Sequence, residues 1–200
     1  VYTDRKNRIN LLDVATRQVT LAVQDPMAEI RDVTFSPDSK WLTYSRPANN
    51  EYSIIYVYNI ADKKEYPVTD KWYDSGSPVF SNDGKYLVFS SARDFNPTYG
   101  SLEWNHVYNN MDGVYLALLS KDTPSPFLEK DAQVAVKEDK AKKEEPKKDA
   151  KKETASETSA VKIDVEGLSD RIIQLPLAGS RYFNFYADGN KVYYFGRGGT

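Results

Sequence analysis

The 200-residue sequence contains no cysteine, a single histidine and no long hydrophobic run. Without cysteine the chain has no disulfide, no cysteine-ligated zinc and no thiol nucleophile. His106 alone does not supply a pair of histidine ligands to a metal, so we expect neither a metal site nor a cofactor. No apolar run approaches the roughly 20 residues of a membrane-spanning helix, so we expect no membrane span.

Neither sign of charge predominates, because 27 lysines and arginines nearly balance 29 aspartates and glutamates. The formal net charge of −2 argues against a nucleic-acid surface, which needs a net basic face, and we expect no nucleic-acid partner. Aromatic residues make up 13% of the chain, with 15 tyrosines. This composition is typical of a soluble β protein.

The usual signatures of a hydrolase site are absent as well. The sequence has no Gly-x-Ser-x-Gly, and one histidine gives no Ser-His-Asp set, so we assign no catalytic residue. The Asp-Ser-Gly-Ser run at 74–77 superficially suggests a reactive serine. Its position before a predicted strand favours a turn instead.

What the sequence does contain is a repeat. Residues 33–45 return as residues 78–90, with an offset of 45 residues from Phe35 to Phe80, and a third copy follows at 185–195. A period of roughly 40–50 residues, built from short strands, is typical of a β-propeller blade. Chemistry on such a scaffold comes from loops, from the central channel or from another domain.

Each copy predicts two strands joined by a tight turn. The Asp-Gly dipeptides at 83–84 and 188–189 tolerate the positive φ of a hairpin turn. The runs at 41–44 and 86–89 consist of β-favouring residues. A second strand pair follows, so we predict an all-β fold with propeller blades of four antiparallel strands. A stack of generic hairpins in a β-sandwich is the alternative.

The repeat divides the chain into five parts. We expect residues 1–29 to form outer strands of a preceding blade, 30–73 a full blade, 74–135 a full blade with a long inner loop at 91–111, 136–161 a disordered Lys/Glu-rich insertion, and 162–200 an outer strand and the start of the next blade. Closed propellers have roughly 4–8 blades. We therefore expect an incomplete ring in this chain and a longer parent protein.

The insertion differs in composition from the rest of the chain. Residues 137–153 are mostly lysine, glutamate, aspartate and alanine, without an aromatic residue. Such a segment buries too little apolar surface to offset the entropy of ordering it. We interpret it as a mobile loop on the propeller rim, with a docking tether as the alternative. Because acidic and basic residues are mixed, simple phosphate or membrane binding is not expected.

The long loop after the second aromatic strand carries the candidate contact residues. It combines charged and aromatic side chains that are suited to a pocket at the mouth of the channel, where they would engage peptide termini and side chains. The alternative is that Arg93 and Asp94 form a structural pair while the aromatic residues pack the loop onto the blade. The candidates for substrate contact are Arg93, Asp94, Tyr99, Glu103, Trp104 and His106.

An ordered series of motifs covers nearly the whole chain. The motifs are F-S-P-D-x-K-W-L-x-Y-S at 35–45, D-S-x-S-P-V-F at 74–80, R-D-F-N-P-x-Y-G at 93–100, K-D-x-P-S-P-F at 121–127 and I-D-x-E-G-L-x-D-R-I-x-x-L-P at 163–176. Together these motifs are more specific than the blade turn alone, and they resemble the tricorn protease family, specifically its second, seven-bladed propeller.

The resemblance implies a role for the chain. Tricorn-like proteins are serine peptidases that trim short peptides, and their propellers are thought to filter and guide those peptides. Their catalytic serine and histidine lie in C-terminal domains after a PDZ-like module, outside this sequence. The resemblance therefore implies a non-catalytic segment whose partners are peptides, other domains of the same polypeptide and further copies in a hexamer. It also implies a cytoplasmic location, with a periplasmic or exported protein as the alternative.

Two other classes of protein share the blade turns. A TolB-like propeller binds protein partners and has no peptidase activity, but it would not carry the motifs at 96–100 and 166–168 in order. A prolyl-oligopeptidase-like enzyme would continue into an α/β-hydrolase with a nucleophile elbow. A tricorn-like parent would continue into a PDZ-like module.

Overall fold

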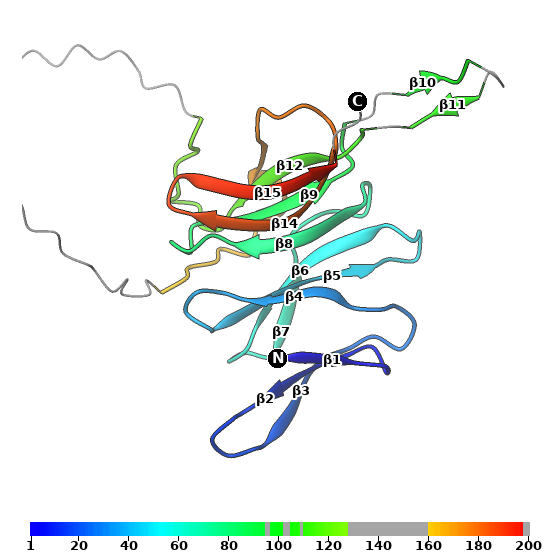
Figure 1. The fold of residues 1–200 in the computed structure, drawn as a ribbon. Coiled ribbons are helices and arrows are strands. Elements are labelled where there is room, and N and C mark those ends of the chain that lie inside the picture. Colours follow the sequence, from blue (N-terminus) through cyan, green and yellow to red (C-terminus); the bar gives the residue numbers. More distant parts are fainter. Residues whose placement is uncertain (95–96, 102–104, 109, 128–159, 198–200) are drawn as a thin grey trace, which may run out of the picture.

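A computed structural model describes residues 1–94, 97–101, 105–108, 110–127 and 160–197, and all of their regular elements except one short turn are strands (Figure 1). The exception is the 3₁₀ turn η1 (Leu168–Arg171). Glu103, Trp104 and most of the expected insertion lie outside the described residues.

Two four-stranded antiparallel sheets form the centre of the structure. The first has the order β4-β5-β6-β7, and the second has the order β13-β12-β9-β8. The first contains β4 (Arg31–Phe35), β5 (Trp41–Pro47), β6 (Ser53–Asn59) and β7 (Lys64–Pro67). The second contains β8 (Ser75–Phe80), β9 (Tyr86–Ser91), β12 (Gly113–Leu118) and β13 (Ile172–Gln174). The predicted blades of four antiparallel strands are therefore confirmed.

Smaller sheets stand on either side of the two blades (Figure 1). Before them comes a three-stranded sheet, and after them a hairpin; a second hairpin lies within the loop between β9 and β12. These elements are β1 (Tyr2–Asp4), β2 (Arg8–Leu12) and β3 (Val19–Gln24); β14 (Arg181–Asp188) and β15 (Lys191–Arg197); and β10 (Thr98–Tyr99) and β11 (His106–Val107).

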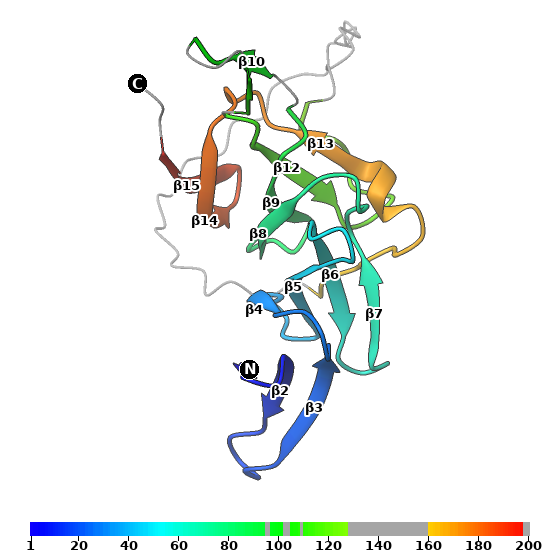
Figure 2. The same ribbon diagram turned by 90° about the vertical axis from the view of Figure 1, so that its right-hand side faces the viewer.

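The second blade takes its outer strand from beyond the insertion. Residues 74–135 supply β8, β9 and β12, whereas the fourth strand, β13, lies within 162–200, where an outer strand was expected. Figure 2 shows β4, β8 and β14 along one edge of the stack, and β7 and β13 along the other. The first strands of successive blades therefore share one edge, as the strands that line a propeller channel do.

The repeated turns have the same internal bonding. Ser36 Oγ donates a hydrogen bond to Asp38 Oδ1, and Ser81 Oγ donates to Asp83 Oδ1, both at 2.6 Å. Each serine hydroxyl also accepts a backbone N–H at 3.0 Å from the first residue of the next strand. The third hairpin is tighter, because Asp188 pairs directly with Lys191 across two residues. The Ser-x-Asp pattern therefore supplies the same local bonds to the first two turns, and Asp38 also accepts the Val161 backbone N–H at 2.9 Å.

One hydrophobic core joins the two blades. Its fully buried members come from both sheets, with Ile55 and Val57 in the first blade and Leu87 and Phe89 in the second. Each of these strands alternates its side chains between two faces, so a single strand contributes to the cores on both sides of its sheet. Burying these faces against one another is the main favourable term that holds the blades together.

The first strand of each repeat carries a β-bulge at the same place. Asp32, Ser77 and Asn184 have φ angles of 55°, 53° and 53°, and the strand register shifts next to each of them. The Asp32 carboxylate accepts hydrogen bonds from the Ser45 hydroxyl at 2.8 Å and from the Ser77 backbone N–H at 3.1 Å. One bulge residue is therefore bonded to the equivalent residue of the next blade.

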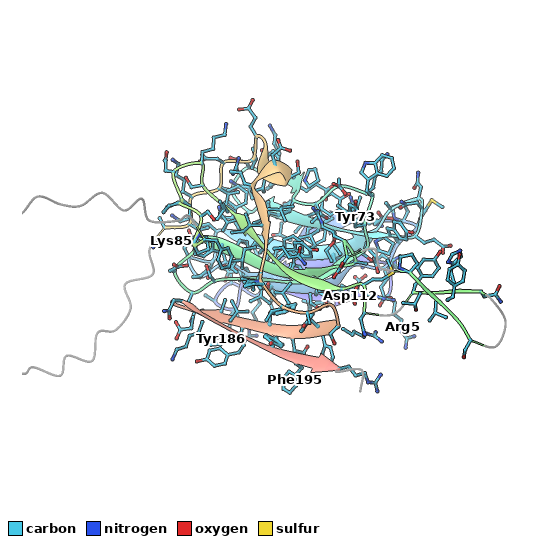
Figure 3. The ribbon with its side chains drawn as sticks, turned by 90° about the horizontal axis from the view of Figure 1, so that it is seen from above. Arg5, Tyr73, Lys85, Asp112, Tyr186 and Phe195 are labelled. Carbon is cyan, nitrogen blue, oxygen red and sulfur yellow. The ribbon has the colours of Figure 1, made fainter. Side chains whose placement is uncertain are left out.

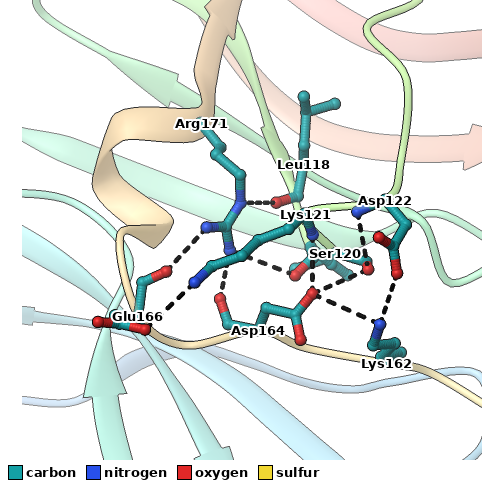
Figure 4. Close-up of polar contacts among 9 residues, drawn as sticks. Leu118, Ser120, Lys121, Asp122, Lys162, Asp164, Glu166 and Arg171 are labelled. Carbon is teal, nitrogen blue, oxygen red and sulfur yellow. Dashed lines mark hydrogen bonds and ion pairs between the residues drawn. The ribbon is translucent and has the colours of Figure 1, made fainter.

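Arg171 fastens the chain that follows the insertion to the end of β12 (Figure 4). Its Nε donates to the Leu118 carbonyl at 3.1 Å, and its Nη1 donates to the Glu166 carbonyl at 2.8 Å. Further bonds from the guanidinium reach the carbonyl oxygens of Leu119, Asp164 and Gly167. A single planar cation thus bonds to five backbone carbonyls on the two sides of the insertion.

Contacts around Asp164 complete this attachment (Figure 4). Its carboxylate accepts hydrogen bonds from the Lys121 backbone N–H at 2.8 Å and from the Ser120 hydroxyl at 2.9 Å. Lys162 pairs with Asp122 at 2.7 Å. The described residues before and after the insertion therefore lie side by side on the second blade.

Candidate functional site

The loops of the two blades are divided between the two ends of the strands. The β4–β5 and β8–β9 turns lie at the same end as the residues next to the insertion, and the β5–β6, β7–β8 and β9–β12 connections lie at the other end. Figure 3 shows Lys85 at the first end and Tyr73 and Asp112 at the second. All the candidate contact residues belong to the β9–β12 connection and therefore to the second end.

Arg93 lies at the base of that connection, packed between aromatic rings. Its guanidinium carbon is 5.3 Å from the ring centre of Tyr73 and 5.5 Å from that of Tyr115. Its Nε donates to the Ser91 hydroxyl at 3.2 Å, and its Nη2 is buried without a hydrogen-bond partner among the described residues. A cation over two ring faces is stabilised by their quadrupoles. Arg93 therefore supports the loop from below.

Asp94 is held by backbone contacts instead. Its N–H donates to the Met111 carbonyl at 3.1 Å, which closes the base of the connection. Gly179 packs against the same point, because a Cβ there would lie 2.2 Å from the Asn110 carbonyl oxygen and 3.1 Å from the Asp94 carboxylate. Within the described part of the chain, no ion pair joins Arg93 to Asp94.

Tyr99 and His106 lie on the β10–β11 hairpin, which projects away from the blades (Figure 1). Their ring centres are 4.8 Å apart, and the ring of Tyr108 lies 6.4 Å from that of His106. Tyr99 is 72% exposed. The candidate residues thus fall into two groups, a packed base and an exposed hairpin. Glu103 and Trp104 belong to the part of the connection that is not described.

A cleft that sequence reasoning missed lies between these loops. Its volume is about 540 Å³, and it is bordered by three different connections. The sequence signal was present as aromatic residues in predicted loops, but nothing in the repeat showed that these loops meet. The side chains that line it include Tyr52, Trp72, Tyr73, Asp74, Tyr108 and Met111.

Asp74 and Asp112 are interacting carboxylates at this end of the second blade. Asp74 Oδ1 accepts the Ser53 backbone N–H at 2.7 Å, which ties the β7–β8 connection to the start of β6. Burial raises the pKa of the Asp112 carboxyl above its usual value, and the charge of Asp74 adds to the rise, while Arg181 opposes it. The negative charge of Asp74 therefore influences the ionisation of Asp112 at this end of the blade.

A second cavity of about 480 Å³ lies beside the first blade and shares Trp72 with the cleft. Arg46 borders it, with its guanidinium 4.5 Å from the ring centre of Tyr56. That cation already pairs with Asp25 at 3.3 Å and with Glu65 at 3.2 Å. The charge of Arg46 is therefore compensated within the protein, although Lys71 also borders this cavity.

Metal ligands do not gather in the described part of the chain. No group of three or more histidine, cysteine, aspartate or glutamate side chains there is placed to hold a metal ion. None of the described helices is long and apolar enough to cross a membrane.

Comparison with known proteins identifies the fold and the family. Residues 1–198 match the family model described as the tricorn protease second beta propeller domain. Tricorn protease homolog 1 of Streptomyces coelicolor is 29% identical over 88% of the chain, and putative tricorn protease homolog 2 of the same organism is 32% identical over 76%. The chain spans 16% and 13% of the lengths of these relatives.

A solved structure gives the same result for the fold. The structure titled "Crystal structure of the tricorn protease" matches 94% of the chain with a TM-score of 0.72 and 18% identity, and the chain covers 17% of that protein. The family model spans almost the whole chain, and the likeness predicted from the motifs is confirmed. The chain therefore belongs to the family of tricorn protease second beta propeller domains.

Proposed function

We propose that this chain is a non-catalytic propeller segment that guides or sieves peptides toward a catalytic domain elsewhere in the same polypeptide. The observation that carries the proposal is the family match over residues 1–198, which falls on a propeller domain of proteases. The edge formed by β4, β8 and β14 supports it, because successive first strands would line one wall of a channel.

The proposal extends to the parent protein. Relatives named as tricorn protease homologues support a peptidase, and we propose the serine type, with the catalytic residues outside this chain. Its partners would be peptide substrates and the other domains of the same polypeptide, including a second propeller, a PDZ-like module and a catalytic domain. We also propose assembly into a hexamer and a cytoplasmic location.

The proposed peptide contacts are the side chains of the β9–β12 connection. Among the described candidates, Tyr99 and His106 are exposed and in ring contact on the hairpin, and Arg93 and Asp94 hold its base. Glu103 and Trp104, between β10 and β11, complete the proposed set. An aromatic surface on a projecting hairpin provides apolar contact to side chains without requiring one sequence.

Peptide hydrolysis by the full-length polypeptide tests the proposal. Replacing Tyr99 and His106 together by alanine should raise KM several-fold and leave kcat largely unchanged, because the hairpin would contact peptide before the chemical step. A variant without the catalytic serine should show no turnover.

The matched control is Phe127→Ala, which removes an exposed aromatic ring close to the insertion. Unchanged KM in the double variant would overturn the contact role of the hairpin. Absence of turnover by the full-length polypeptide, combined with recovery of protein partners, would favour a TolB-like interaction propeller instead.

A further inference from the structure

The cleft between the β5–β6, β7–β8 and β9–β12 connections has the composition of a cation-binding site. Four partly exposed aromatic residues border it: Tyr52, Trp72, Tyr73 and Tyr108 are 47%, 77%, 38% and 56% exposed. Their side chains come from three different connections, so they gather by folding and not by sequence adjacency. Aromatic rings around a cavity attract cations through the negative faces of their π systems.

A carboxylate lies among these rings. Asp74 is the one charged residue in the described lining of the cleft. Its Oδ1 is used by the Ser53 N–H, and within the described residues its Oδ2 has no hydrogen-bond or ion-pair partner. A cation that enters the cleft would therefore find one unoccupied acceptor in addition to the ring faces.

One of the rings that border the cleft, Tyr73, already contacts a cation of the protein, Arg93. The Arg93 guanidinium lies 5.3 Å from the ring centre of Tyr73, and it is packed below the loop. Arg93 does not border the cleft itself. Asp112 is a second acidic group that interacts with Asp74 at this end of the blade, and Arg181 partly offsets it.

We propose that this cleft binds the α-ammonium group of a peptide, with the ammonium at Asp74 and the first side chain among the aromatic rings. The volume of about 540 Å³ exceeds what a lone ammonium needs and accommodates a terminal residue. Every linear peptide with a free amino terminus carries this group whatever its sequence. The inference rests on the proposed function only in taking a peptide as the ligand.

Calorimetric titration of the full-length polypeptide with three probes tests the assignment. The probes are Leu-Gly-Gly, N-acetyl-Leu-Gly-Gly and Nα-acetyl-lysine amide. The free tripeptide should bind at least tenfold more tightly than its acetylated form, because acetylation removes the charge that Asp74 would accept. Trp72→Ala and Asp74→Asn should each weaken binding of the free tripeptide by about tenfold.

Two matched controls and a conservative variant separate binding from folding. Phe127→Ala removes an exposed ring, and Asp62→Asn removes an exposed turn carboxylate; both lie away from the cleft and should leave the affinity unchanged. Trp72→Phe keeps an aromatic face and should restore most of the affinity. Because Trp72 is 77% exposed, its substitution should leave the thermal midpoint unchanged.

The outcomes distinguish this inference from the proposed function. Equal binding of the free and acetylated tripeptides would overturn it, and so would affinities that Trp72→Ala and Asp74→Asn leave unchanged. Tighter binding of Nα-acetyl-lysine amide would replace the α-ammonium by a lysine side chain as the ligand. If peptide turnover depends on the β10–β11 hairpin while the cleft variants bind normally, the proposed function stands and the cleft assignment fails.

Discussion

Arg171 shows how one side chain holds an outer strand in place. The guanidinium bonds to five carbonyl oxygens in two segments, residues 118–119 and residues 164–167. The first segment ends β12, and the second precedes β13. The carbonyls of Leu119 and Gly167 also accept backbone N–H bonds, so what the arginine adds is a planar fork of donors that bridges the two segments.

Replacing Arg171 should therefore destabilise the second blade. We expect Arg171→Ala to lower the free energy of unfolding by about 2 kcal/mol, because several carbonyl oxygens lose a charged donor. Arg171→Lys should recover less than half of the loss, since an ammonium cannot bridge both segments. Urea unfolding measures both effects.

The control for this residue is Arg5→Ala. Arg5 is exposed in the turn between β1 and β2, at the place labelled in Figure 3, and its loss should cost little. Full stability in Arg171→Lys would mean that charge alone accounts for the effect and would contradict the role of the fork.

At the scale of the elements, the turns between the first two strands of each blade repeat with one difference. Gly84 and Gly189 both adopt positive φ angles, of 68° and 57°. A Cβ at Gly84 would lie 2.7 Å from Val161 Cγ2, whereas a Cβ at Gly189 would have no atom within 4 Å. Gly189 is therefore required only by its backbone conformation, whereas Gly84 is required by its backbone conformation and by close packing against Val161.

This difference gives a matched pair of substitutions. Gly189→Ala should cost about 1 kcal/mol, the usual penalty for a side chain in the left-handed region. Gly84→Ala should cost roughly 1–3 kcal/mol more, since the new methyl group overlaps Val161. Thermal unfolding compares them, and Gly84→Ala combined with Val161→Ala should recover part of the difference. Equal losses in the two single variants would argue against the packing contribution.

The elements differ in how far the sequence determines them. The turns were predictable because Asp-Gly acts locally through backbone freedom, and the Ser-x-Asp hydrogen bonds found in the structure also span only two residues. The bulges were not, because Asp32, Ser77 and Asn184 share no residue type. Asp32 is fixed in part by its bond to Ser77, 45 residues away.

The site was less predictable than the fold for a related reason. The candidate residues were chosen from one long loop, and the structure separates the described ones into a packed base and an exposed hairpin. The aromatic cleft combines residues from three loops, and one of its rings, Tyr52, lies in a connection that looked unremarkable in sequence. Sequence periodicity identifies strands, but the meeting of loops depends on how blades stack.

At the scale of the whole molecule, the two ends of the blades carry different structural features. The end with the β4–β5 and β8–β9 turns carries Arg171 and the described residues next to the insertion. The end with the β5–β6, β7–β8 and β9–β12 connections carries the projecting hairpin and the aromatic cleft. Between them, a core shared by two blades fixes the relative positions of the two ends. The loops at either end are therefore positioned by a core to which both blades contribute.

The shared core predicts that the two blades unfold together. Leu87, in β9, is fully buried in the cluster that also contains Ile55 and Val57 of β6. Leu87→Ala should lower the free energy of unfolding by about 2–5 kcal/mol, through lost burial and the cavity that remains. Hydrogen exchange should show the same loss of protection in β6 as in β9, because strands that share a core open as one cooperative unit.

The exposed Val14, at 85% accessibility, provides the control, and Val14→Ala should change protection in neither strand. Loss of protection confined to β9 would show that the second blade opens while the first stays folded. In that case the blades would be coupled only through their backbone connections and the bond between Asp32 and Ser77. Equal loss in both strands would instead identify the pair of blades as the smallest unit that presents the hairpin and the cleft.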